Sequence, residues 1–167
     1  IDSIQMYLRP SEIRFSQDSI GRSFGCYTSH PYRPIGETLD DIITGRINVN
    51  SIPRISVCKR NGHWFTADNR RLWVFQEAEK RGKCTEIYVQ ETFYIDINKI
   101  TTINNGISVV VRGNPGGFRW KTMPVQKIQR EFPKPIFPTT LQTSISSNHS
   151  VYQLHVDELD TKKVLLA

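Results

Sequence analysis

The segment 55–78, ISVCKRNGHWFTADNRRLWVFQEA, carries the strongest structural signals in this chain of 167 residues. Its first part alternates apolar and polar side chains and then reaches Asn61-Gly62, a pair that accepts positive φ angles and favours a two-residue hairpin turn. Residues 63–66 then form the returning strand. In the last part the apolar residues recur with helical spacing, as Leu72, Val74, Phe75 and Ala78. The segment therefore predicts a hairpin, a tight turn and a helix.

Two adjacent arginines stand at the predicted start of this helix. Asp68 or Asn69 is expected to cap the helix with its side chain. Free N–H groups, the positive end of the helix dipole and the guanidinium groups of Arg70 and Arg71 suit a phosphate. The alternative is that Arg70 is a solvated surface residue and that Arg71 pairs with a carboxylate from the helix at Glu37. The first interpretation predicts an anion site.

Composition limits the class of protein. The chain is long enough for one domain, or one domain with an appendage, and no apolar run reaches the roughly 18 residues of a membrane span. Its three cysteines share no metal-ligand spacing, so we expect neither a disulfide framework nor zinc, and a reducing compartment such as the cytoplasm. The net charge of +6 fits either a polyanionic partner or a plain basic surface. Because the chain begins at Ile1, we expect it to be excised from a longer protein.

The residues before the hairpin predict a strand, a loop and a helix. Residues 13–17 alternate as a short strand, and the Gly-, Ser-, Pro- and Tyr-rich residues 21–36 form either a binding loop or a surface connection. A helix is expected to open at Glu37-Thr38 and to stop at Gly45. A further strand is expected at 86–89.

The second half of the chain has a different sequence pattern. Residues 100–112 predict a second hairpin that turns at 104–106, followed by a strand at 118–123 and a short helix at 125–132. A Pro-rich segment and a tail follow. We therefore expect an α+β core over residues 1–97 and a β-rich extension over residues 98–167, whose function the sequence does not indicate.

The order of elements is carried by IRFSQDSI (13–20), ETLDDIITGRIN (37–48) and IPRISVCKRNGHWFTADNRRLWVFQEAEKRGKCTEIYVQ (52–90). In this order the chain resembles the ParB/sulfiredoxin-like superfamily. It looks most like the ParB-like nuclease domains at the C-termini of bacterial polymorphic toxins. The resemblance covers about residues 13–90 and implies a small mixed sheet with two or three packed helices.

The resemblance also implies a site. Members of the superfamily bind phosphates at a helix N-terminus; some bind or hydrolyse nucleoside triphosphates, some transfer a phosphoryl group, and some are nucleases. The matching positions for phosphate or nucleotide binding are Asn69, Arg70 and Arg71. Gln17 and Asp18, at the end of the first strand, lie where the family's phosphate-contacting segment falls.

Four residues are candidates for catalysis. Arg71 would stabilise charge that develops in the transition state. Asp68 is either a ligand of Mg²⁺ or a general base, or only the cap of the helix. Glu37 is either a catalytic carboxylate or a complement to its own helix dipole. His63 is either a general base or a half-exposed strand histidine.

Two classes of function follow. The first is a phosphate-directed effector enzyme, a nuclease acting on nucleic acid, with an NTPase or phosphotransferase as its alternative; as a toxin domain it would act in the cytoplasm of a target cell. The second is a nucleotide- or nucleic-acid-binding module without catalysis, favoured by the Asp68-Asn69 pair that stands where the family has Gly and Glu. Mg²⁺ is the expected cofactor of the enzyme, without zinc, haem or flavin. The expected partner is nucleic acid or a nucleoside triphosphate.

Overall fold

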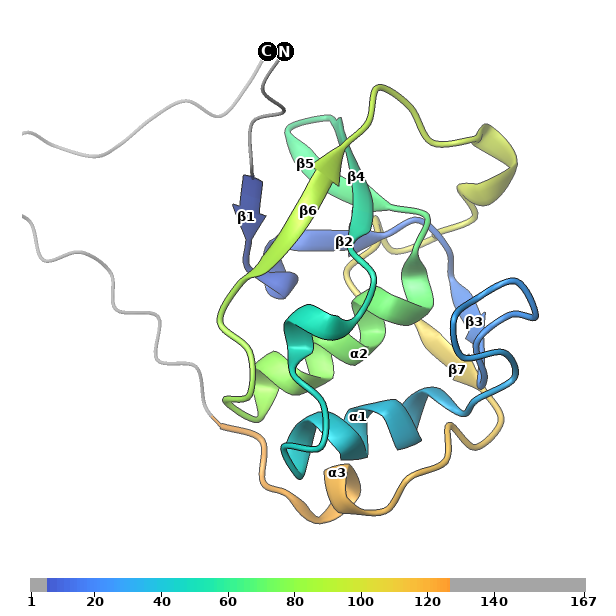
Figure 1. Ribbon diagram of the computed structural model, residues 1–167. Coiled ribbons are helices and arrows are strands. Elements are labelled where there is room, and N and C mark those ends of the chain that lie inside the picture. The colour runs from blue at the N-terminus through green and yellow to red at the C-terminus, as the bar shows by residue number, and fades with distance from the viewer. Residues whose placement is uncertain (1–5, 127–167) are drawn as a thin grey trace, which may run out of the picture. The chain divides into compact units, whose positions relative to one another are not determined.

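The predicted hairpin is the centre of the sheet. The computed structural model describes residues 6–126 (Figure 1) and places β4 at Ile55–Arg60 and β5 at His63–Thr66. Asn61 has a φ of 48° and Gly62 a φ of 79°, the pair of positive angles that a tight hairpin turn requires. The hairpin is therefore confirmed, and so is the α+β class, a mixed sheet with three helices.

Five strands form the main sheet, in the order β1-β6-β4-β5-β2. The remaining strands are β1 at Met6–Leu8, β2 at Ile13–Phe15 and β6 at Ile87–Glu91. β6 runs parallel to β4, and β2 runs parallel to β5, whereas the other two pairs are antiparallel. The parallel pair β2 and β5 matters for the site, because their carboxyl ends lie at the same edge of the sheet.

Helix α2, Asn69–Lys80, crosses beneath the sheet, and α1, Ile35–Ile43, lies on the side of α2 away from the sheet (Figure 1). α1 begins two residues before the position predicted for it, and Gly45 follows its end with a φ of 73°. The predicted apolar stripe of α2 is buried, and Trp73 is buried as well because a second layer covers this helix. Its buried residues are Asn69, Leu72, Trp73, Val74, Phe75 and Ala78.

The second predicted hairpin is wrong. The turn at 104–106 exists, but the one strand of this region, β7 at Val110–Arg112, pairs in parallel with β3 at Ser19–Gly21. The residues before the turn instead bind the end of β2, where the N–H groups of Thr101 and Thr102 donate to the Ser16 carbonyl at 2.9 and 3.0 Å. β7 lies within the residues expected to form a strand, but its partner was not predicted, because β3 lies far away in the sequence.

Residues 118–123 form a short helix, α3 at Arg119–Thr122, so the predicted strand is also wrong. Its position is set by Asp40 of α1, whose carboxylate accepts the N–H groups of residues 118–120 at 2.6 to 3.1 Å. The Trp120 ring then meets Trp73 edge-on, with 5.4 Å between centroids. The first two residues of the helix predicted at 125–132 are not helical, and the rest lie outside the described residues, as do the Pro-rich segment and the tail.

Residues 98–126, expected as an extension after the core, contribute β7 and α3 to the same compact unit as the residues before them. Within residues 6–126, no helix is long and apolar enough to span a membrane.

The attachment of α3 to α1 is expected to depend on pH. Partial burial raises the pKa of Asp40. The hydrogen bonds from the three backbone N–H groups of residues 118–120 lower the pKa by more than burial raises it, so the net pKa lies below the ordinary 3.8. A carboxyl with a depressed folded pKa stabilises above the unfolded value and loses that contribution as the pH falls through the folded one. Tryptophan fluorescence of the wild type should therefore change only below about pH 3.8, whereas Asp40→Asn should show the changed spectrum at neutral pH. Identical spectra of the two proteins at neutral pH would contradict this account.

Candidate phosphate-binding site

A cavity of about 250 Å³ opens where the carboxyl ends of β2 and β5 meet the first turn of α2. Because Phe15 of β2 pairs with Thr66 of β5, the residues that follow each strand are brought together. The loop 22–34 and a 3₁₀ turn at Ile97–Lys99 complete the wall. The cavity is lined by Gln17, Phe24, Gly25, Thr28, Ala67, Asp68, Asn69, Arg70, Arg71 and Lys99.

Asn69 ties the end of β2 to the start of α2. Its side-chain oxygen accepts the Ser16 N–H at 2.9 Å, and its amide nitrogen lies 3.0 Å from the Ser16 hydroxyl and 3.2 Å from the side-chain oxygen of Gln17. Only 3% of Asn69 is exposed. The Asn69 amide, predicted as a phosphate ligand, is thus occupied by the protein's own groups.

Asp68 holds the cap position of α2, but its side chain does not cap the helix. One carboxylate oxygen accepts the Ser56 N–H at 2.9 Å, and the other is paired with the Arg71 guanidinium. The predicted side-chain cap from Asp68 or Asn69 is therefore wrong. As a result, the N–H groups of residues 69–71 have no hydrogen-bond acceptor among the described residues.

The guanidinium of Arg71 binds groups of the protein itself. Besides the pair with Asp68, its guanidinium donates to the carbonyls of Pro53 and Arg54, at 3.1 and 2.5 Å. These contacts hold the entry to β4 against α2. The carboxylate partner of Arg71 is thus Asp68 and not a residue of α1.

Arg70 is the free cation of the pair. Within residues 6–126, its guanidinium has no hydrogen bond and no ion pair, and it lies against two glycines. A Cβ atom added at Gly21 would lie 3.0 Å from Nη2 of Arg70, and one at Gly25 would lie 3.6 Å from Nη1. The glycines therefore leave room for the guanidinium at the cavity. Lys99 is a second cation on the wall, in a region where the sequence showed no signal for a site.

The remaining predicted residues are dispersed. Gln17 lines the cavity, whereas the carboxylate of Asp18 accepts the Thr101 hydroxyl at 3.1 Å and does not line it. Glu37 lies 3.9 Å from Arg33 and is outside the cavity. His63 is exposed beside the hairpin turn and lines a separate hollow near Trp64. Of the four catalytic candidates, only Asp68 and Arg71 line the cavity.

The chemistry of the cavity is that of an anion site. Within residues 6–126, the N–H groups of residues 69–71 and the Arg70 guanidinium are unpaired at the positive end of α2, and Lys99 lines the cavity from the 3₁₀ turn. Asp68 is the one carboxylate among the lining residues, and its charge is already balanced by Arg71. Within the described part of the chain, no group of three or more His, Cys, Asp or Glu side chains is placed to hold a metal ion.

Comparisons with known proteins leave the geometry as the basis for assigning a function: no family model, no curated protein and no solved structure matches the chain.

Proposed function

We propose that this protein binds the phosphate groups of nucleic acid, or of a nucleotide, at the cavity formed by the start of α2. The observation that carries the proposal is the pairing of an uncommitted guanidinium, Arg70, with three uncommitted N–H groups in the same helical turn. A phosphate oxygen accepts from both kinds of donor at once. The net charge of +6 favours a polyanion as the carrier of that phosphate.

The geometry supports binding better than a named reaction. Hydrolysis by a nuclease or an NTPase, and phosphoryl transfer, need a group that activates or positions the attacking oxygen beside the phosphate. Both carboxylate oxygens of Asp68 already have partners, and Glu37 and His63 lie elsewhere. We therefore place the binding module first. The nuclease, its Mg²⁺ and the toxin setting stay predictions of the resemblance.

We further infer that the fold is of the ParB/sulfiredoxin-like type. The inference is supported by the order of β2, α1, the β4–β5 hairpin, α2 and β6, and by the position of Arg70 and Arg71 at the start of α2. It is also supported by the convergence of Gln17 with that helix start.

Pyrophosphate is the direct probe of the proposed site. A ligand at about 100 times its Kd stabilises the folded state by about 2.7 kcal/mol, so pyrophosphate should raise Tm by several degrees. The control is sodium chloride at the same ionic strength, which should leave Tm within about 1 °C of its value in buffer. Equal melting curves in the two salts would contradict the proposal.

The same protein tests the enzymatic alternatives. Plasmid DNA, RNA and nucleoside triphosphates are incubated with it, with and without Mg²⁺, and the products are separated by electrophoresis or chromatography. Intact substrates together with a pyrophosphate-dependent Tm select the binding module, whereas cleavage of one substrate would select the nuclease or the hydrolase.

A further inference from the structure

The phosphate cavity is the first of three adjoining hollows. A second hollow of about 430 Å³ shares Phe24, Thr28 and Arg71 with it. A third, of about 500 Å³, shares the segment 51–53 with the second. Neighbouring hollows thus have wall residues in common, from the start of α2 to the edge of the sheet at β6 and β1.

Aromatic side chains line the second and third hollows. Phe24, Tyr27 and His30 belong to the second, and Tyr27 is fully exposed. In the third, Tyr7 and Tyr88 are cross-strand partners on β1 and β6, with 5.6 Å between ring centroids. Tyr7 and Tyr27 are exposed, Tyr88 is half-buried and Phe24 is buried. Exposed rings are surfaces on which nucleic-acid bases stack.

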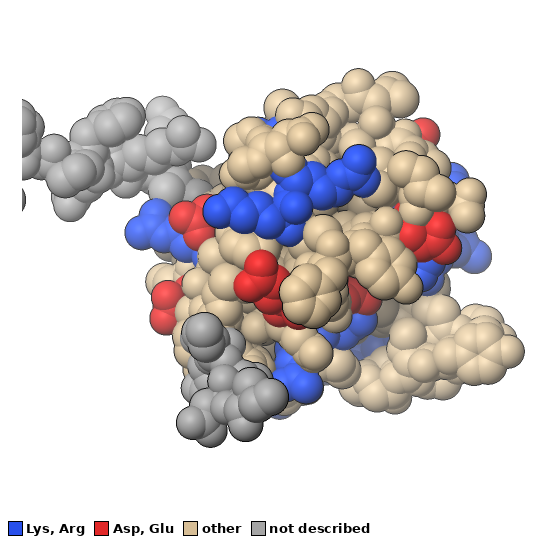
Figure 2. All heavy atoms as spheres, turned by 90° about the horizontal axis from the view of Figure 1, so that it is seen from above, with Lys and Arg blue, Asp and Glu red and all other residues tan. Residues whose placement is uncertain are grey.

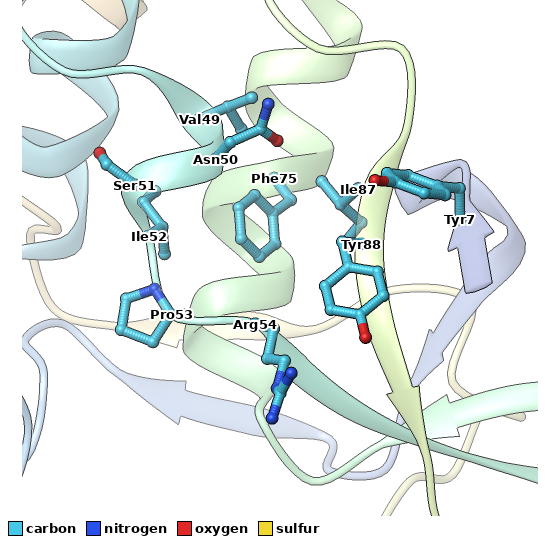
Figure 3. A pocket seen from close by; sticks show the side chains of 10 residues that line it. All are labelled: Tyr7, Val49, Asn50, Ser51, Ile52, Pro53, Arg54, Phe75, Ile87 and Tyr88. Carbon is cyan, nitrogen blue, oxygen red and sulfur yellow. The ribbon is translucent and has the colours of Figure 1, made fainter. Parts of the chain in front are cut away.

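Cations outnumber carboxylates in the linings of the hollows. Across all three linings, Asp68 is the one carboxylate, and Arg71 neutralises it. In the third hollow, the Arg54 guanidinium lies over the Tyr88 ring, 5.7 Å from its centroid, and has no ion pair among the described residues. Figure 3 shows Arg54 beside Tyr88 at one end of the third hollow. Phe75 of α2 lies between the segment 49–54 and strand β6.

Carboxylates do occur on other parts of the protein surface. Figure 2 shows a face on which Lys and Arg side chains lie among Asp and Glu side chains. The net charge of the protein is therefore less informative than the linings, where cations stand next to aromatic rings.

An unpartnered hydroxyl adds an independent observation. Thr38 of α1 forms part of the wall of the second hollow and is 6% exposed, yet its side-chain oxygen has no hydrogen-bond partner within residues 6–126. Buried polar atoms are nearly always paired, so this hydroxyl marks the wall of the second hollow as a place with an unused polar group.

We propose that the occupant of the three hollows is a single strand of nucleic acid. The inference rests on the proposed function, since one phosphate of the strand would bind at Arg70. Further along, bases stack on the rings of the second and third hollows, and Arg54 meets a phosphate near Tyr88. In a duplex the bases are stacked on one another and their faces are covered, so concave aromatic surfaces select unpaired bases.

The test uses fluorescence anisotropy with a labelled thymidine strand of about ten nucleotides, within the range of about 4–16 that single-strand grooves cover. At fixed salt, the strand should bind at least about tenfold more tightly than a duplex of the same length. Tyr88→Ala should weaken the strand by about 5- to 100-fold. The matched control is Tyr94→Ala, which removes an exposed tyrosine outside the three hollows and should bind like wild type.

A second pair of variants provides a test that does not depend on whether Tyr88→Ala folds. Arg54→Gln should weaken the strand several-fold, and Arg60→Gln, outside these hollows, should not. Pyrophosphate should still raise the Tm of Arg54→Gln, because Arg70 is intact.

The outcomes separate the two proposals. Equal binding of strand and duplex, or wild-type affinity in both Tyr88→Ala and Arg54→Gln, overturns the single-strand inference while a pyrophosphate-dependent Tm leaves the phosphate site standing. Loss of strand binding in these variants without any response to pyrophosphate supports the stacking surface and overturns the phosphate site.

Discussion

Arg70→Gln is expected to reduce the rise in Tm that pyrophosphate gives the wild-type protein and to shift it to higher pyrophosphate concentration. The guanidinium of Arg70 has no partner within residues 6–126 and faces the cavity at the start of α2. Its removal therefore costs little stability in the absence of ligand, whereas it removes a charge-assisted contact of about 1.5–3 kcal/mol in its presence. Affinity should fall by about 10- to 100-fold, measured as the concentration of pyrophosphate that gives half of the Tm shift.

Arg60→Gln is the matched control for this variant. It removes the same charge from β4, and Arg60 does not line the cavity. It should keep the full pyrophosphate response at a given ionic strength. A full response in Arg70→Gln, or an equal loss in both variants, would mean that net charge and not this site holds the anion.

Asn69→Ala is expected to lower the free energy of unfolding by about 2–4 kcal/mol. The substitution leaves the buried Ser16 hydroxyl without its donor and deprives the Ser16 N–H of its shortest bond. It also releases Gln17 from α2. Urea unfolding followed by far-UV circular dichroism measures the change.

The exposed Asn50 provides the comparison. Its side chain makes no hydrogen bond within the described residues, so Asn50→Ala should change the free energy of unfolding by less than about 0.5 kcal/mol. A loss below about 1 kcal/mol in Asn69→Ala would show that β2 is held to α2 by other contacts.

The elements that the sequence predicted correctly are those encoded by neighbouring residues. The Asn61-Gly62 turn and the stripe of α2 depend on local backbone preference and on periodicity. The pairing of the Val110–Arg112 strand with β3 does not depend on local preference. β3 lies some 90 residues earlier, and many strands could pair with the same run of valines. The same holds for α3, whose position depends on the Asp40 carboxylate.

The site shows a similar division. The resemblance placed Gln17 and Asp18 at the site with the two arginines. The structure brings Gln17, Asp68 and both arginines to one cavity, whereas Asp18 lies outside it. It did not separate the tasks of Arg70 and Arg71, since neighbours on a helix point about 100° apart. Arg71 is held by the carbonyls of residues 53 and 54, and Arg70 is therefore the arginine left for a ligand. These contacts arise only in the folded structure, so the sequence does not reveal them. Lys99 was missed for the same reason.

The pairings of β2 and β3 impose an order on assembly during synthesis. β2 finds its parallel partner only when residues 64–66 have been made, and the Ser16 carbonyl finds its donors only with Thr101 and Thr102. β3 waits for residues 110–112. A chain emerging from the ribosome therefore carries strand edges without partners until nearly all of the described fold has appeared, and open edges are templates for pairing between chains. The nascent form of this protein is thus most exposed to pairing between chains before residue 112 has been made.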